Sequence, residues 1–230
     1  PGNFTHTSLP GGSADTHAIA VGDVNADGLM DVVVGNFAHP NQLLESTCAG
    51  TTLTLSVSDL AVAGTRDTSA VVVADANVDG HYDIVFGNYG AANQLLMSDS
   101  SGHFSSSDLV SGNVTSLTFS VVTLQATDNT RAIAVDDVNG DGSPDIVVGN
   151  YGQENQVLYG SCSASFTPEV LPGGAKLTTS VALGSLMCGG AAIDIVFGND
   201  AGQANDLLAA VTPGNFTHTS LPGGSADTHA

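Results

Sequence analysis

The apolar residues of the chain fall into short runs typical of strands, and the runs recur in the same order four times. A continuous apolar run comes first, as in 18–21, 70–73 and 132–135, and such a run favours a strand buried on both faces. A β-branched segment ending in Gly-Asn follows, and Gly-Asn marks a turn. These segments are 31–36, 83–88, 145–150 and 194–199.

Two more strands complete each unit. The third begins at Asn41, Asn93, Asn155 and Asn205. The fourth is rich in Ser and Thr that alternate with apolar residues, as in 52–60 and 166–171, and this alternation predicts a half-exposed strand. No segment has convincing helical periodicity, so we expect an all-β chain.

The period of the pattern predicts the architecture. The aspartates that open the β-branched segments are spaced by 52, 62 and 49 residues, a typical length for a propeller blade of four strands. We predict one domain of β-propeller-type blades with four-stranded antiparallel sheets, four blades per 212-residue period. The blades are expected at about 13–64, 65–126, 127–175 and 176–222. The extra length of the second blade, around 98–112, is interpreted as an insertion.

An acidic motif, Asp-x-Asn-x-Asp-Gly-x-x-Asp, separates the first two strands in three of the units. Oxygen ligands at alternate positions around a turn glycine suit a hard cation such as Ca²⁺. We expect side-chain ligands at positions 1, 3, 5 and 9 and a main-chain carbonyl at position 7. The expected ligands are Asp23, Asn25, Asp27, Leu29 and Asp31; Asp75, Asn77, Asp79, His81 and Asp83; and Asp137, Asn139, Asp141, Ser143 and Asp145.

The same residues also favour turns, so an Asx-turn without an ion is the alternative for each loop. Three copies with three carboxylates each favour calcium, because metal-free loops would suffer mutual repulsion. Mg²⁺ is less suited, since it retains water and takes few protein ligands. The fourth unit has Leu186, Cys188 and Gly190 in place of the first three ligands and keeps only Asp194. We therefore expect three structural sites and none in the fourth unit.

The charge of the chain restricts its partners. The formal net charge is −20, and Arg66, Arg131 and Lys176 are the only Lys or Arg residues. Nucleic acid and anionic membranes need positive charge on the protein, so neither is an expected partner. No uncharged stretch is long enough to span a bilayer, and no signal peptide is visible after Pro1.

The two ends of the sequence are duplicates. Residues 213–230 repeat residues 1–18 without a change. We treat 1–12 and 213–230 as a duplicated terminal segment, which gives the chain one fourth strand more than four blades need. Three explanations stay open: a window of a longer polymer, a strand that completes a neighbouring subunit's sheet, or an artefact. A contact that repeats without closing generates a filament.

Other residues carry weaker signals. Asn3, Asn113 and Asn215 lie in Asn-x-Thr acceptors for N-glycans. Cys48, Cys162 and Cys188 are interpreted as buried or incidental thiols, with one bridged pair left open. The aromatic after Gly-Asn (Phe37, Tyr89, Tyr151) packs between blades or forms a sugar platform. No His-Glu-x-x-His pattern or serine nucleophile elbow is present.

The acidic loops with their β-branched strands, such as 21–28 with 31–36, resemble the FG-GAP/VCBS repeats of integrin-α-like propellers. The resemblance covers nearly the whole chain. It implies a β-propeller with calcium in the loop between the first two strands of a blade. It also implies a secreted or cell-surface protein that acts in adhesion, sugar binding or assembly.

These observations lead to one functional prediction and two alternatives. We expect a non-enzymatic, extracellular, calcium-stabilised repeat protein that self-associates into a fibre or surface appendage through its duplicated terminal segment. The first alternative is a carbohydrate-binding lectin or adhesin that uses clefts between blades. The second is an accessory domain of a larger secreted enzyme.

Overall fold

The computed structural model describes residues 8–11, 14–50, 52–60, 67–98, 120–123, 128–161, 165–186 and 192–221, and all its regular elements are strands. The first unit contains β1 (Asp15–Gly22), β2 (Asp31–Phe37), β3 (Asn41–Ala49) and β4 (Thr52–Leu60). The second contains β5 (Asp67–Ala74), β6 (Asp83–Ala91), β7 (Gln94–Met97) and β8 (Ser120–Thr123). The third contains β9 (Asp128–Asp136), β10 (Asp145–Gln153), β11 (Gln156–Tyr159) and β12 (Thr167–Val170). The fourth contains β13 (Lys176–Gly184), β14 (Asp194–Asn199), β15 (Asp206–Thr212) and β16 (Asn215–Ser220).

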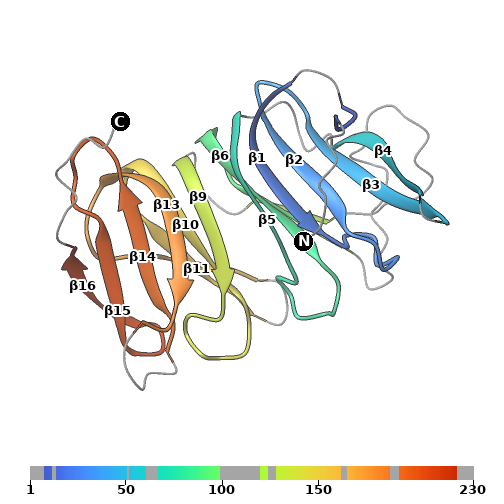
Figure 1. Ribbon diagram of the computed structural model, residues 1–230. Coiled ribbons are helices and arrows are strands. Elements are labelled where there is room, and N and C mark those ends of the chain that lie inside the picture. Colours follow the sequence, from blue (N-terminus) through green and yellow to red (C-terminus); the bar gives the residue numbers. More distant parts are fainter. Residues whose placement is uncertain are drawn as a thin grey trace, which may run out of the picture.

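Each unit is an antiparallel sheet in which sequential strands are neighbours, as the hydrophobic pattern predicted (Figure 1). The third and fourth units repeat this order. Short bridges of β6 with β9 and of β10 with β13 join the last three units. The fold is therefore of the β-propeller type, as predicted. The exact limits of the blades stay a prediction, and the insertion around 98–112 lies almost wholly outside the described residues.

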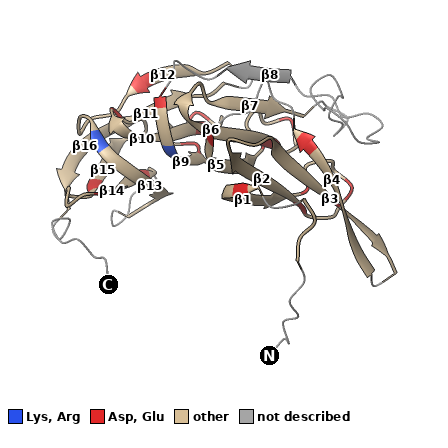
Figure 2. Ribbon diagram, turned by 90° about the horizontal axis from the view of Figure 1, so that it is seen from above, with Lys and Arg blue, Asp and Glu red and all other residues tan. Residues whose placement is uncertain are grey.

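The units follow one another along an open arc, with the first strands on its concave side and the fourth strands on its convex side (Figure 2). Among the described strands, none of the first unit pairs with one of the fourth. The described residues contain no helix that could cross a membrane.

The core lies between the sheets, in three layers that each join two neighbouring units. The first layer contains Val33 and Leu43 of the first unit against Ile84, Phe86 and Leu96 of the second. Equivalent apolar residues fill the layer between the second and third units and the layer between the third and fourth units. The second and third sheets thus bury one face against the preceding sheet and the other against the following sheet.

The expectation that the first strands are buried on both faces is wrong for β1. Ile19 and Val21 are 56% and 58% exposed, because no other sheet among the described residues packs on this face of the first unit. The second strands are the most deeply buried, since they lie inside each sheet: in β6, every residue from Asp83 to Asn88 is buried. A continuous apolar run therefore fits the second strand better than the first.

The Gly-Asn segments form turns, as predicted, and their side chains make a repeated network. In the first unit the Asn36 side chain donates to the Pro40 carbonyl (2.7 Å), accepts from Thr16 (2.9 Å), and its backbone N–H donates to Asn41 (2.9 Å). The Asn41 side chain then donates to Thr68 of the next unit (2.9 Å). The network therefore fixes the turn and ties neighbouring units together.

Candidate metal centre

The three acidic loops have the same internal hydrogen bonds. In loop 23–30, the Asp23 carboxylate accepts the backbone N–H groups of Asp27 (3.0 Å) and Gly28 (2.9 Å). The Asp27 carboxylate accepts from the Leu29 N–H (2.8 Å) and from the Asn25 side chain (3.2 Å). Loops 75–82 and 137–144 repeat these bonds at closely similar distances. The sequence motif therefore specifies one loop conformation.

Two positions of each loop adopt left-handed backbone angles. The sixth position is a glycine in all three loops, with φ of 87°, 90° and 88°, where a side chain would be strained. The fourth position also has positive φ: 58° at Ala26, 60° at Val78 and 74° at Gly140. A β-branched residue rarely adopts this conformation, so the surrounding hydrogen bonds must hold Val78 in it at a cost in stability.

The aspartates that close the motifs are buried inside the fold. Asp31 is fully buried, and its two oxygens accept the N–H groups of Val24 (3.1 Å) and Ser46 (2.8 Å). Asp83 and Asp145 make the same pair of contacts. Each carboxylate thus ties the start of its loop to the third strand of its sheet or to the residue directly after that strand. Sequence reasoning assigned these residues to metal alone and missed this second role.

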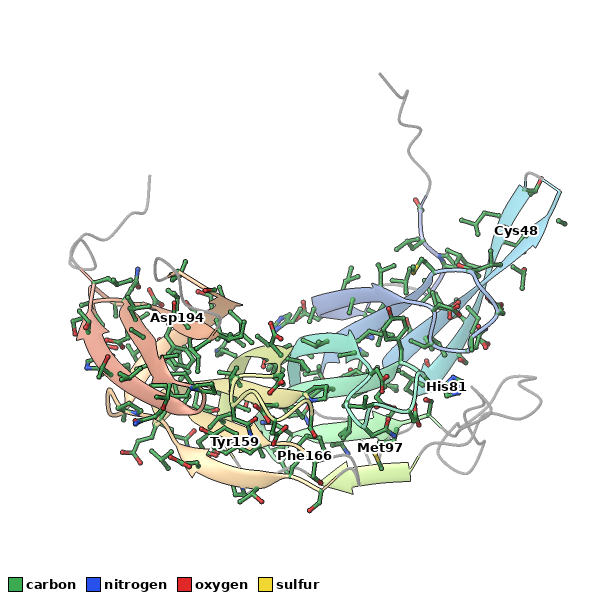
Figure 3. All side chains as sticks on the ribbon, turned by 90° about the horizontal axis from the view of Figure 1, so that it is seen from below. Cys48, His81, Met97, Tyr159, Phe166 and Asp194 are labelled. Carbon is green, nitrogen blue, oxygen red and sulfur yellow. The ribbon has the colours of Figure 1, made fainter. Side chains whose placement is uncertain are left out.

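The fourth unit has an equivalent buried aspartate, although it lacks the rest of the acidic motif. Asp194 accepts the N–H groups of Leu186 (2.7 Å) and Ala210 (2.8 Å), and it lies at the start of β14 (Figure 3). Leu186 is described and exposed, whereas Cys188 and Gly190 lie outside the described residues. The closing aspartate therefore fixes a loop that lacks the other acids.

Burial changes the acidity of these closing carboxyl groups. It raises the pKa of Asp83 to about 6 and that of Asp145 to about 6, against the opposing effect of the backbone hydrogen bonds. The pKa of Asp31 is raised for the same reason, with a further contribution from the negative charges of Asp27 and Asp23. The acidic loops therefore concentrate negative charge beside a carboxylate that is already poorly solvated.

The donor set fits a hard cation, although the loop oxygens already have protein partners. Each loop offers two aspartates and one asparagine near a buried aspartate, and these are oxygen ligands of the kind Ca²⁺ takes. No group of three or more His, Cys, Asp or Glu side chains among the described residues is arranged as a ready metal cage. Each oxygen that accepts one N–H has further lone-pair capacity. Calcium therefore stays a prediction. The hydrogen bonds expected for the alternative, an Asx-turn without an ion, are present.

One residue near the first loop was not identified from the sequence. Burial raises the pKa of Glu45, with further effects from the charge of Asp31 and a hydrogen bond to Asn25. Glu45 therefore adds a carboxylate to the first loop. The equivalent positions in the other units are Met97, Tyr159 and Ala209, so the repeat pattern gave no signal for it.

The third loop is in contact with the fourth unit. The Gly214 N–H donates to the Val138 carbonyl (3.0 Å), and the Tyr159 hydroxyl donates to the Gly214 carbonyl (3.2 Å). A Cβ on Gly214 would lie 3.1 Å from the Cβ of Asn139. The turn that opens the duplicated segment 213–230 therefore supports the acidic loop of the preceding unit.

The aromatic residues after Gly-Asn contact other side chains of the protein. The Arg131 guanidinium lies over the rings of Tyr89 (4.8 Å) and Tyr151 (5.3 Å), which belong to neighbouring units. The ring of Phe37 stacks on that of His17 at 5.0 Å. Of these three contacts, the one between Arg131 and Tyr89 joins two units, whereas the other two lie within a single unit. Tyr89 is 36% exposed.

The expected glycosylation sites and cysteines lie partly within the described residues. Asn215 is exposed on β16, at the edge of the fourth sheet, whereas Asn3 and Asn113 lie outside the described residues. Cys48 is a free, exposed thiol on the β3–β4 hairpin of the first unit, so it is not buried (Figure 3). Cys162 lies outside the described residues. The His81 ring nitrogen Nδ1 is buried without a hydrogen-bond partner.

The fold and the loops define a class: an all-β repeat protein of the propeller type with acidic inter-strand loops. Residues 23–86 match the model of the FG-GAP-like repeat, and residues 129–159 match that of the FG-GAP repeat. These two stretches, which lie in the first three units, are therefore repeats of the FG-GAP type. A search of curated proteins found no match.

Two solved structures with similar folds were found among several. Crystal structures of BBS1N in complex with ARL6DN, soaked with mercury and with lead, match with TM-scores of 0.53 and 0.54 at 13% identity. They cover 91% and 92% of this chain, but the chain spans only 55% and 59% of theirs. At this identity the match supports the fold alone, and it extends across all four units.

Proposed function

We propose that this protein, which contains FG-GAP repeats, is a non-enzymatic, extracellular structural protein whose sheets are stabilised by calcium and whose copies assemble into a fibre or surface appendage. The observation that carries the proposal is the threefold acidic loop with one shared conformation, in a chain whose ends repeat the same 18 residues. FG-GAP repeats are typical of extracellular or surface proteins, which agrees with this location.

The acidic loops would hold the metal through their own residues. In the first loop these are Asp23, Asn25 and Asp27, with the carbonyl of Leu29 and the remaining lone pairs of Asp31. A bound Ca²⁺ supplies positive charge to each loop. Three Ca²⁺ ions would contribute six positive charges against the formal net charge of −20. Because the ion binds the folded loop and not the unfolded chain, it stabilises the fold by mass action.

A structural role agrees with the position of the loops. Each loop joins the first two strands of a unit, and its closing aspartate reaches the third strand or the residue directly after it. Ordering the loop therefore orders three strands of the sheet. No serine, cysteine or lysine recurs at the same position of the three loops, so we propose no reaction for them.

The metal is tested by thermal unfolding. We expect EDTA to lower the melting temperature and an excess of CaCl₂ to restore it, whereas MgCl₂ restores it less. A melting temperature that is the same with EDTA and with CaCl₂ would contradict structural calcium. Isothermal titration of the chelated protein counts the sites, and we expect three.

The assembly is tested by imaging. Negative-stain micrographs of concentrated protein in calcium should contain fibres with a repeat along their length. Discrete particles at every concentration would contradict the structural role. A glycan array on the same sample tests the alternative lectin function, for which the exposed Tyr89 is the best candidate for stacking on a sugar.

A further inference from the structure

Among the described residues, two sheet faces, one on the first unit and one on the fourth, lack the neighbouring sheet that every internal face has. On the first unit, Ile19, Val21, Val32, Val34 and Leu44 form what we call the first-unit face. On the fourth unit, Ala182, Val196, Leu207 and Leu221 form what we call the fourth-unit face. Both sets follow from the repeat, because each residue is equivalent to one that is packed between two internal units.

Burial differs between equivalent positions according to whether a neighbouring unit is present. On the side that faces the preceding unit, Ile133 of the third unit is 9% exposed, but its equivalent Ile19 is 56% exposed. On the side that faces the following unit, Leu171 is 3% exposed at the end of the third unit, whereas Leu221 is half-buried. The first-unit face and the fourth-unit face thus correspond to the two sides of an internal boundary between units.

A Leu-Pro-Gly segment, which we call a connector, precedes the first unit (from Leu9), joins the third and fourth units (from Leu171) and follows the fourth unit (from Leu221). The described residues of the two outer connectors have the geometry of the internal one. Between the third and fourth units, the Leu171 N–H donates to the Asn155 carbonyl (2.9 Å), and the Leu221 N–H donates to Asn205 in the same way (2.8 Å). Gly173 has φ of 124°, and Gly11, before the first unit, has φ of 124°. Both ends are therefore shaped to continue the arc.

The segment Leu9–Gly11 occupies the place of such a connector on the first-unit face. A Cβ on Gly11 would meet the Gln42 side chain, and one on Gly173 would meet the Asp206 side chain, which holds the equivalent position in the fourth unit. A cavity of about 100 Å³ remains between this segment, Ile19, Val34 and Leu44. The connector thus covers Val34 and Leu44 but leaves Ile19 and Val21 exposed.

The polar network crosses two of the three internal boundaries and is incomplete at both ends. The Asn41 and Asn155 side chains donate across their boundaries to Thr68 (2.9 Å) and Thr178 (3.0 Å), whereas the side-chain nitrogen of Asn93, at the boundary between the second and third units, has no hydrogen-bond partner. No described residue donates in this way to Thr16, and none accepts from the side-chain nitrogen of Asn205. An asparagine donor therefore lies at one end and a threonine acceptor at the other.

From these observations we infer that the first-unit face of one copy of the chain binds the fourth-unit face of a second copy, in the geometry of the three internal boundaries. The inference rests on the proposed role as a fibre subunit and specifies its contact. Because the two faces differ, the contact is heterologous: it gives a closed ring if the rotation between copies closes and a filament if it does not, and the proposed fibre requires the filament. Burial of exposed apolar side chains drives it.

One connector is enough for each junction. Residues 213–230 repeat residues 1–18, so either copy supplies the same Leu-Pro-Gly sequence at the boundary. The other copy's connector is then displaced from the junction. The duplication therefore makes the two ends compatible without requiring any new sequence at the contact.

The experiment uses two variants of the whole chain, each with one altered face. Ile19→Lys with Val21→Lys alters the first-unit face, and Ala182→Lys alters the fourth-unit face at an exposed site that a single chain tolerates. Leu53→Lys, at a residue 59% exposed on β4, is the matched control. Circular dichroism and melting temperature establish that each variant folds. Sedimentation velocity over a concentration series in CaCl₂ then measures assembly.

We expect the wild-type chain and the Leu53→Lys control to form species of increasing length. Each face variant alone should lose every species above the monomer. An equimolar mixture of the two face variants should form a dimer and nothing larger, because only one intact pair of faces remains. Should Ala182→Lys be too mild to block assembly, Leu207→Lys on the same face should block it.

Several results would overturn the inference. Folded variants of both faces that assemble like the wild type would exclude these surfaces while leaving the fibre role intact. A mixture that stays monomeric, or that forms long chains, would exclude a heterologous contact between the two faces. A wild-type chain that stays monomeric at all concentrations in calcium would remove both this contact and the proposed fibre.

Discussion

The fourth unit and the first three share their strands and closing aspartates but differ in everything else that the acidic motif contains. Asp194 makes the same two backbone contacts as Asp145, yet no aspartate precedes it at the other positions of its loop. The comparison of the fourth unit with the others therefore separates the role of the closing aspartate from that of the other loop acids. The closing aspartate belongs to the fold, and the exposed acids at positions 1, 3 and 5 belong to the proposed ion.

The same comparison extends to the faces of the sheets. The fourth unit has the apolar residues of an internal unit on the side that faces away from the third. Its Val196 and Leu207 are only partly buried, whereas the equivalent Val147 and Val157 of the third unit are fully buried. The fourth unit therefore lacks the acidic loop but keeps the apolar residues of an internal unit on that face.

The largest expected effect is on the closing aspartates. Asp145→Ala and Asp194→Ala should each lower the free energy of unfolding by about 2–4 kcal/mol, because buried N–H groups lose their acceptor. The effect at Asp194 should be the same with EDTA and with calcium. Urea unfolding of both variants measures it. A neutral Asp194→Ala would show that the backbone contacts of the fourth unit contribute little, and the separation of roles would fail.

A glycine at each boundary provides the next test. A Cβ on Gly87 would lie 2.8 Å from methyl groups of Ile133 and Thr130 in the next unit, whereas one on Gly198 would meet only Ser180 of its own sheet. Gly87→Ala should therefore cost about 1–3 kcal/mol through overpacking, and Gly198→Ala should cost less because the serine side chain can rotate. Thermal unfolding compares them. Equal losses would mean that the distance between units does not limit this position.

The metal-loop acids should have an intermediate effect that depends on calcium. Asp79→Ala should lower stability by about 1–3 kcal/mol in saturating calcium, because binding to the folded state is lost, and by less after chelation. Asp200, whose side chain only accepts the adjacent Ala201 N–H (2.7 Å), is the matched exposed control. Calorimetry in CaCl₂ and in EDTA measures both variants. A loss at Asp79 that is unchanged by EDTA would contradict an ion at this loop.

The strand order and the repeat could be predicted because both depend on local pattern. Period-two alternation, Gly-Asn turns and the spacing of Asp31, Asp83, Asp145 and Asp194 identify the strands and their number without knowledge of long-range contacts. The third strands begin at or one residue after the predicted asparagines. The loop conformation also follows from local residues, since its hydrogen bonds join positions close in sequence.

The features that were missed depend on contacts between distant residues. Asp31 reaches Ser46, 15 residues away, and Glu45 approaches the first loop only because the sheet places β3 beside it. The exposure of Ile19 could not be inferred from an apolar run, because the run is the same whether or not a unit precedes it. Sequence pattern indicates which residues are apolar, but only the assembled order of units decides which face is covered.

The smallest expected effect concerns pH, at a position where the first and fourth units differ in charge. Asp206 lies where the first unit has Gln42, and it accepts from Lys176 (2.6 Å) and contacts the His218 ring (2.6 Å). Burial acts to raise the pKa of Asp206, but hydrogen bonds from Lys176, His218 and Asn199 hold it below the usual value.

Because the pKa of Asp206 is lower in the folded than in the unfolded chain, its ionised form adds stability above about pH 4, the usual value for Asp, and this stability is lost as the pH falls further. Asp206→Gln, which copies the first unit, should therefore be less stable than the wild type at pH 6, with a difference that shrinks toward pH 3. Urea unfolding of the two proteins across this range, both in EDTA so that the metal loops do not contribute, measures the difference. A gap that stays constant or widens on acidification would mean that the lysine and histidine do not stabilise the carboxylate, and the fourth unit would then differ from the first in packing alone.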